Sequence, residues 1–197
     1  MTSADTLPDT VEDKLLWPLL RVLRTCAATQ LGLVRRSVCA FPIVVGATAP
    51  PADRCDCTCR PPGSTAQGQG QAWIRFVTGR TVPRTAANGR QLPADVCGGL
   101  SWALTVELGV YRCWPTLDQH RNPPSDAAYD KASHGMTRDQ AALRRAVACC
   151  APLARKSVPW NIDQAGPMSP SGGCVGVYQT ATFTRDDCTC PQGGEQR

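Results

Sequence analysis

The tetrapeptide Asp-Cys-Thr-Cys occurs twice, at residues 56–59 and 187–190, and it is the strongest candidate for chemistry in the chain. Two Cys-x-Cys pairs could supply four thiolates to a tetrahedral Zn²⁺, although structural zinc sites commonly use Cys-x₂₋₄-Cys turns. In a strand, the two sulfurs of Cys-x-Cys lie on one face about 7 Å apart, so each could pair with a neighbouring strand. Three states therefore stay open: reduced structural thiols, disulfides, or a metal site.

Twelve cysteines are many for the cytosolic product that we expect. The first fourteen residues lack the basic and apolar regions of a signal peptide, and no apolar run approaches the ~20 residues that span a bilayer. Disulfides would then form after a particle carrying the protein leaves the cell. Cys149 and Cys150 are expected to pack on a helix. The possible thiol or disulfide cluster comprises Cys55, Cys57, Cys59, Cys188 and Cys190. If the segments flanking the first and last strands are neighbours, Cys57–Cys190 or Cys59–Cys188 is the expected pair.

Catalytic chemistry finds little support in the sequence. The two histidines, His120 and His134, lie in polar surroundings without a nucleophile motif nearby. Residues 68–71 lack the Lys-Ser/Thr ending of a phosphate loop. Glu107 is expected on a solvent face or at a subunit contact. We therefore predict no catalytic residue, no cofactor and no bound metal, and a protein that is not an enzyme.

Four arginines, Arg75, Arg80, Arg84 and Arg90, follow one another closely in the sequence. They are either a solvated loop or a set that a ring of subunits presents to DNA phosphates or to an acidic partner. The formal charge of +5 comes without a run of five basic residues, which argues against a dedicated nucleic-acid-binding protein.

The longest regular pattern is residues 101–114, where apolar and polar residues alternate with a period of two. Fourteen residues in extended conformation would span roughly 45 Å, far longer than an average strand of about six residues. We therefore expect a central β-strand here.

The remaining elements flank this strand. We expect a helix over residues 9–30, kinked by Pro18 or beginning near Trp17, and a second helix over residues 126–150, with a break at Gly135 as the alternative. Further strands are expected at residues 34–45, 72–78, 157–163 and 174–185, the first at an edge because of Pro42. The order α-β-β-β-α-β-β predicts one α+β domain over residues 1–197, in which two helices cover a mostly antiparallel sheet of four to five strands. Long loops are expected at residues 46–71 and 79–99, a turn at residues 164–173, and a frayed tail at residues 186–197.

Several short segments in this order resemble the tail terminator (head-to-tail connector) proteins of long-tailed phages of actinobacteria, and together they cover most of the chain. They are the N-terminal helix, Cys-Gly-Gly at residues 97–99, Arg-Cys-Trp-Pro-Thr at residues 112–116, Pro-Pro-Ser at residues 123–125 and Gly-Gly-Cys-Val-Gly at residues 172–176. The chain departs from the pattern in the insertion at residues 55–71 and in Cys188 and Cys190.

The resemblance implies an α+β subunit of a virion neck, assembled in the host cytoplasm into a hexameric ring. Its partners would be other copies of itself, the major tail protein and the head-completion connector proteins, with DNA passing through the lumen without sequence specificity. The long strand would project in part into a neighbouring subunit, with Val110 and Tyr111 at the subunit interface. A neighbouring stopper or head-closure protein, a cysteine-rich zinc- or disulfide-stabilised binding module, and an enzyme with a cysteine nucleophile are the alternatives.

Overall fold

The fold is taken from a computed structural model, which describes residues 13, 15–46, 48–52, 69–83, 100–150, 153, 159–171 and 173–186. Two helices and five strands occur in these ranges. In chain order they are α1 (Leu16–Leu33), β1 (Ile43–Val45), β2 (Gln71–Pro83), β3 (Leu100–Cys113), α2 (Asp126–Ala148), β4 (Trp160–Ser171) and β5 (Cys174–Asp186). The α+β class and the two helices predicted from the sequence are confirmed.

The five strands form one sheet in the order β1-β2-β3-β5-β4, with β1 parallel to β2 and all other neighbours antiparallel. The long strand β3 is central, as its alternating pattern predicts. It pairs with β2 from Leu100 to Tyr111 and with β5 from Ser101 to Cys113. Both edges of β3 are thus filled within the subunit, so the expectation that part of it projects into a neighbouring subunit is wrong.

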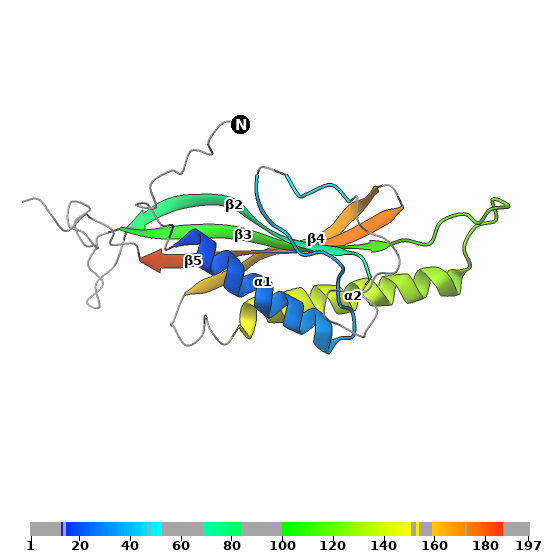
Figure 1. The fold of residues 1–197 in the computed structure, drawn as a ribbon, viewed down its shortest axis with the longest axis horizontal. Coiled ribbons are helices and arrows are strands. Elements are labelled where there is room, and N and C mark those ends of the chain that lie inside the picture. The colour runs from blue at the N-terminus through cyan, green and yellow to red at the C-terminus, as the bar shows by residue number, and fades with distance from the viewer. Residues whose placement is uncertain are drawn as a thin grey trace, which may run out of the picture.

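Both helices lie on the same side of the sheet, α1 over β1–β3 and α2 over β3–β5 (Figure 1). The core forms between the two layers. It takes alternate residues of β3, namely Leu104, Val106, Leu108 and Val110, and the buried faces of the helices. Burial of these side chains is the main favourable term that holds the helices on the sheet.

The first helix begins later than Asp9, whose surroundings lie outside the described residues. Asp13 precedes the helix, and its carboxylate accepts hydrogen bonds from the backbone N–H groups of Leu15, Leu16 and Trp17. Burial by itself would raise the pKa of Asp13, but these three hydrogen bonds outweigh it and lower the pKa. The start near Trp17, one of the two alternatives, is therefore close to the observed one, and Pro18 falls in the first turn, where it is tolerated.

The helix ends in a Schellman-type turn. The N–H of Arg36 donates to the carbonyl of Leu31, and the N–H of Arg35 donates to Gly32. Arg35 takes the left-handed conformation that this turn requires, with φ of 56°. Glycine is preferred at such a position because any Cβ is crowded there.

Replacing Arg35 with glycine is therefore expected to raise the free energy of unfolding by about 0.5–1 kcal/mol. Urea unfolding of the purified variant measures the change. Arg35→Ala, which keeps the Cβ, serves as the control and should bring no such gain. Equal stabilisation by both variants would show that the backbone conformation is not the cause.

The second helix is continuous, so the single-helix prediction is confirmed and the break at Gly135 does not occur. Ser125 caps it by accepting a hydrogen bond from the N–H of Ala128. Gly135 has a packing reason, since a Cβ there would lie 2.7 Å from a guanidinium nitrogen of Arg36. The glycine opens a path for that side chain between the helices.

The strands at the two ends of the sheet differ from expectation. Only Ile43–Val45 of the expected strand 34–45 forms a strand, and Pro42 precedes this short edge strand as predicted. Residues 164–173, expected as a turn, mostly belong to β4, which continues to Ser171 through two register shifts. Such irregularities, with Pro167 and Pro170, are typical of an edge strand, because a proline there costs no ladder hydrogen bond.

Candidate interaction surfaces

The face of the sheet opposite the helices carries a buried ion pair between neighbouring strands. Arg75 of β2 and Glu107 of β3 are register partners, and two hydrogen bonds of 2.7 and 2.9 Å join them. Trp73 Nε1 donates to the same carboxylate at 3.1 Å. Glu107 is therefore a buried acceptor rather than the expected solvent-facing or subunit-contact residue. The main partner of Arg75 is thus Glu107 of its own subunit. The hydrogen bond to Glu107 outweighs burial and raises the pKa of Arg75.

An aromatic pair lies beside this ion pair. The rings of Trp73 and Tyr111 have centroids 4.4 Å apart. Gly109 makes room for the indole, because a Cβ there would lie 1.9 Å from it. Burial raises the pKa of the Tyr111 phenol, and Glu107 adds to the effect.

Val110 and Tyr111, expected at a subunit interface, are 0% and 6% exposed in this chain. Val110 faces the helices and Tyr111 packs on Trp73. The structure corrects the prediction: both side chains belong to the core of their own subunit. A charged residue at either position would destabilise the subunit itself, so loss of assembly in such a variant would not report on a contact between subunits.

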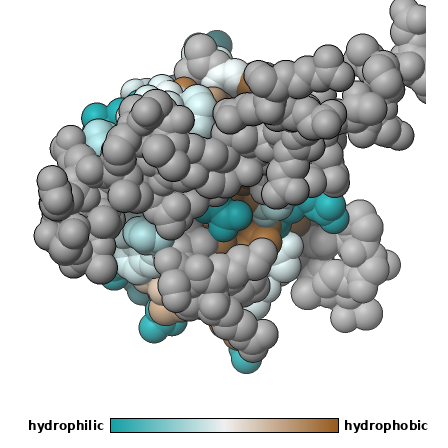
Figure 2. All heavy atoms as spheres, turned by 90° about the vertical axis from the view of Figure 1, so that its left-hand side faces the viewer, coloured by the Kyte–Doolittle hydropathy of each residue, from teal (hydrophilic) through white to brown (hydrophobic). Residues whose placement is uncertain are grey.

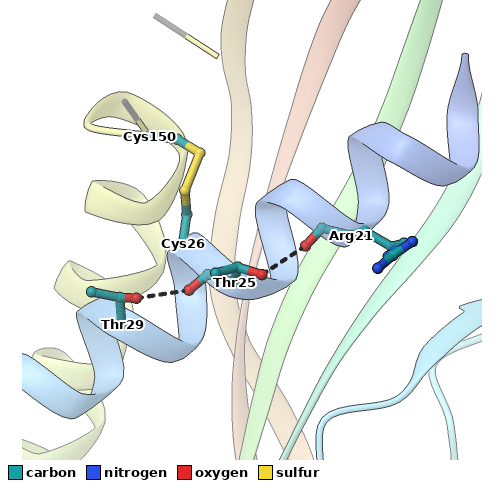
Figure 3. The surroundings of a disulfide bond; sticks show 5 residues. All are labelled: Arg21, Thr25, Cys26, Thr29 and Cys150. Atoms are coloured by element: carbon teal, nitrogen blue, oxygen red, sulfur yellow. Dashed lines mark hydrogen bonds between the residues drawn. A yellow bond between two sulfur atoms is a disulfide. The ribbon is translucent and has the colours of Figure 1, made fainter. Parts of the chain in front are cut away.

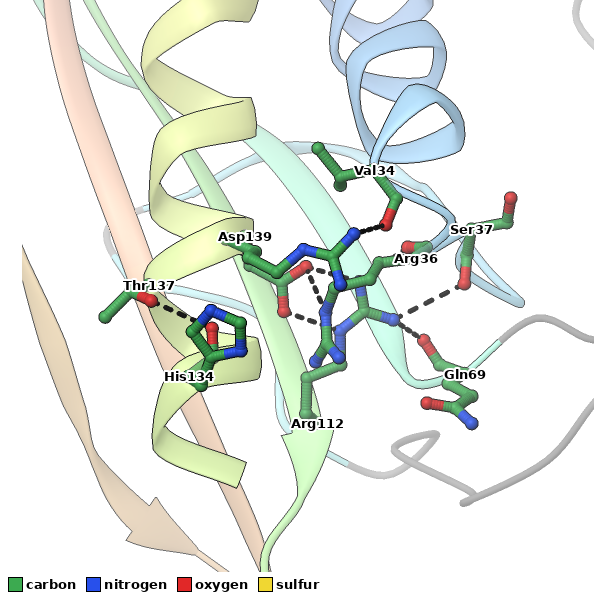
Figure 4. A network of polar contacts seen from close by, with 9 residues as sticks. Val34, Arg36, Ser37, Gln69, Arg112, His134, Thr137 and Asp139 are labelled. Atoms are coloured by element: carbon green, nitrogen blue, oxygen red, sulfur yellow. Dashed lines mark hydrogen bonds and ion pairs between the residues drawn. The ribbon is translucent and has the colours of Figure 1, made fainter. Parts of the chain in front are cut away.

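A second polar cluster joins the two layers of the fold. Asp139 of α2 is fully buried and receives hydrogen bonds from Arg36, which follows α1, and from Arg112 at the end of β3. Figure 4 shows both guanidinium groups directed at the carboxylate. Arg112 also donates to the backbone carbonyls of Arg36, Ser37 and Gln69. Burial lowers the pKa of Arg112, and Asp139 opposes this effect.

This cluster is structural, because its charges are turned inward and paired. The sequence carried one signal for it: Asp139 occupies a position on the apolar stripe of α2, between Met136 and Leu143. A carboxylate in a buried stripe requires a partner. Which arginine would meet it could not be read from the sequence.

Disulfides dominate among the described cysteines. Cys26 of α1 and Cys150, just after α2, are joined across a sequence separation of 124 residues, with Cα atoms 5.7 Å apart (Figure 3). Cys39, Cys113 and Cys174 are also disulfide-bonded, and Cys149 is free and exposed. Five of the six described cysteines are therefore oxidised. The expectation that Cys149 and Cys150 pack is wrong for Cys149, which is exposed, whereas Cys150 is buried in the core. Both residues follow α2, which ends at Ala148.

Parts of the two outer edges of the sheet have no backbone partner among the described residues. β1 covers β2 only from Ile74 to Phe76, and no described residue pairs with the outer edge of β2 from Val77 to Pro83. At the other end of the sheet, β4 has a described partner only in β5. Unpaired strand edges are ready to accept a strand of another chain.

Three exposed tryptophans lie at one end of the molecule, where α1, β3 and β4 begin. Trp17, Trp102 and Trp160 are 47%, 37% and 42% exposed. Viewed from this end, hydrophobic surface is visible between hydrophilic residues (Figure 2). Tryptophan is strongly enriched among the residues that dominate protein–protein binding energies. This tryptophan end is therefore a candidate contact for another protein.

The other predicted site residues are placed as follows. Arg80 is exposed on β2. Arg84 and Arg90, and all five members of the cluster Cys55, Cys57, Cys59, Cys188 and Cys190, lie outside the described residues. The proximity of the four arginines, and that of the two Asp-Cys-Thr-Cys segments, therefore stays a prediction.

Within the described ranges, no group of three His, Cys, Asp or Glu side chains is arranged to hold a metal ion. A groove of about 380 Å³ runs between α2 and the strands β4 and β5, with Met136, Pro167 and Val177 among its lining residues. The Oε1 atom of Gln140, another lining residue, is buried and has no hydrogen-bond partner among the described residues.

Comparison with known proteins adds no relative: the chain matches no family model and no curated protein. None of the helices in the described part of the chain is both long and apolar enough to cross a membrane. The surfaces described above are therefore the basis for a functional assignment.

Proposed function

We propose that this protein is a structural subunit of a phage neck, a tail terminator that closes into a ring, ends the tail tube and joins it to the head-completion connector. The observation that carries the proposal is that no described residue pairs with the outer edge of β2 after Phe76 or with the outer edge of β4, which lie toward opposite ends of one sheet. Two different edges that meet between copies make a head-to-tail contact, and such contacts generate rings when the rotation closes.

Two further features support this function. The α+β subunit with two helices is what the resemblance to tail terminators implies. A stopper or head-closure protein would be favoured by a compact β-barrel without a helix over residues 126–150, whereas this chain has an open sheet and α2. The tryptophan end would serve as the docking surface for the major tail protein or the connector.

The outer edge of β2 offers a direct test, because one of its backbone donors can be removed. The N–H of Ile74 points outward and donates to the carbonyl of Pro42. Backbone groups alternate along a strand, and the register shifts by one between Phe76 and Thr78, so the N–H of Thr81 also points outward. Thr81→Pro deletes this donor at an edge, where proline is tolerated.

Thr81→Pro is expected to abolish ring formation while it changes the free energy of unfolding by no more than about 1 kcal/mol. Mass photometry and negative-stain imaging measure ring formation, with purified tail tubes added. The matched control is Thr81→Val, which keeps the N–H and should form rings. Rings formed by the proline variant would rule out this edge, and a wild-type chain that stays monomeric with tail tubes present would contradict the proposed function.

A second candidate function is a disulfide-stabilised binding module. It is favoured by the five disulfide-bonded cysteines among the six described. A neck protein made in the host cytoplasm would acquire these bonds after the virion is released. Alkylation followed by mass spectrometry can compare the cysteines of the chain in intracellular assemblies and in released virions. Disulfides found only in the virion support the terminator. Disulfides formed before assembly support the binding module.

A further inference from the structure

The solvent side of α2 and the turn after α1 carry five exposed cations, Arg35, Lys131, Arg138, Arg144 and Arg145, which we call the basic helix face. Arg138 also donates to the carbonyl of Val34, which places the turn after α1 beside α2. These five side chains together carry a charge of +5, which equals the formal net charge of the whole chain.

The exposed carboxylates of the two helices are Asp126 and Asp130, both near the start of α2. Helix α1 contains no Asp or Glu, and the only acidic residue of α2 after Asp130 is Asp139, which is buried and held by Arg36 and Arg112. None of the five cations has an ion pair with a described residue. In contrast, Arg75 on the other face of the sheet is paired with Glu107.

Three of the cations form a straight stripe. Lys131, Arg138 and Arg145 are seven residues apart, so they lie on one side of α2 and are separated by about 10.5 Å along its axis. Arg144 lies about 100° around the helix axis from Arg145, and Arg35 follows Val34, whose carbonyl Arg138 contacts. Arginine and lysine presented along a line match the continuous phosphate charge of a DNA backbone.

We propose that the basic helix face binds the phosphate backbone of duplex DNA without sequence specificity. The inference rests on the proposed function for its setting, because a neck ring is threaded by DNA. DNA is favoured over an acidic protein because α2 exposes no large hydrophobic side chain, and the end of α1 beside Arg35 exposes a single one, Leu33. Protein interfaces depend on buried apolar anchors, whereas phosphate binding needs only the charges. The helix layer, and not the Arg75 to Arg90 segment, is then the surface that meets DNA.

The test is the salt dependence of binding to a short fluorescent DNA duplex of arbitrary sequence, followed by anisotropy. In the variant Arg144→Gln/Arg145→Gln, weaker binding is expected, and the slope of log K against log salt should become shallower by about two, close to one per lost phosphate contact. Both residues are exposed, so thermal unfolding should match that of the wild type.

The matched control is Arg80→Gln, an exposed arginine of β2 outside the helix layer, which should leave the slope unchanged. A loss of binding in Arg80→Gln but not in the double variant would overturn the proposal in favour of the strand arginines. The proposal would also be overturned if the wild-type protein did not bind the duplex, or if it bound polyglutamate as tightly as DNA of equal charge. Mass photometry of the same samples separates the two hypotheses: rings without DNA binding contradict only this inference, and DNA binding without rings contradicts only the proposed function.

Discussion

Replacing Asp139 with asparagine is expected to lower the free energy of unfolding by about 3–5 kcal/mol, the usual cost of breaking a buried ion pair from one side. The carboxylate is fully buried and accepts hydrogen bonds from Arg36 and Arg112. Without its charge, the guanidinium of Arg112, itself only 5% exposed, stays in the interior with no counter-ion. Urea unfolding followed by circular dichroism measures the change.

The control for this variant is Asp130→Asn on the same helix. Asp130 is exposed, so its loss should change the free energy of unfolding by less than about 0.5 kcal/mol. If Asp139→Asn unfolds at the same urea concentration as Asp130→Asn, the cluster does not hold the two layers together and its role in the fold is wrong.

Removal of the disulfide between Cys26 and Cys150 is expected to cost about 4–5 kcal/mol of stability in the oxidised protein. The bond closes a loop of 124 residues and ties the middle of α1 to the end of α2. Without it, the unfolded chain gains much of the conformational freedom that the cross-link removes. The double variant Cys26→Ala/Cys150→Ala leaves no new thiol and is compared with the wild type by urea unfolding.

Cys149→Ala is the matched control, because it removes the exposed free thiol next to the bond. Its stability should stay within about 0.5 kcal/mol of the wild type. The expectation fails if the double variant is as stable as this control, or if peptide mapping of the oxidised wild type finds Cys26 alkylated as a free thiol.

The helices and the central strand could be predicted because their signals are local. The two-residue alternation at residues 101–114 identifies β3, and the apolar stripe at residues 126–150 identifies α2 despite Gly135. The second half of β4 was missed because Gly166, Pro167 and Pro170 favour a turn locally. Pairing with β5 overrides that preference, which an edge strand can accommodate.

Partners distant in sequence could not be predicted. The alternation of β3 places Val110 and Tyr111 on opposite faces, but it does not say that α-helices cover one face and Trp73 the other. In the same way, Glu107 was expected in solvent because a lone carboxylate on a strand is usually exposed. Only the antiparallel register with β2 puts Arg75 opposite it.

Hydrophobic periodicity depends only on neighbouring residues, so it is enough to predict the α+β class, the central place of the long strand in the sheet and the continuity of the second helix. Which charged side chains are paired and which are exposed depends on tertiary contacts. Contacts between residues 27 to 124 positions apart pair Arg75, Arg112 and Cys26 with their partners and leave the arginines of α2 in solvent. Such contacts follow from the packing of the layers, and no local pattern encodes them.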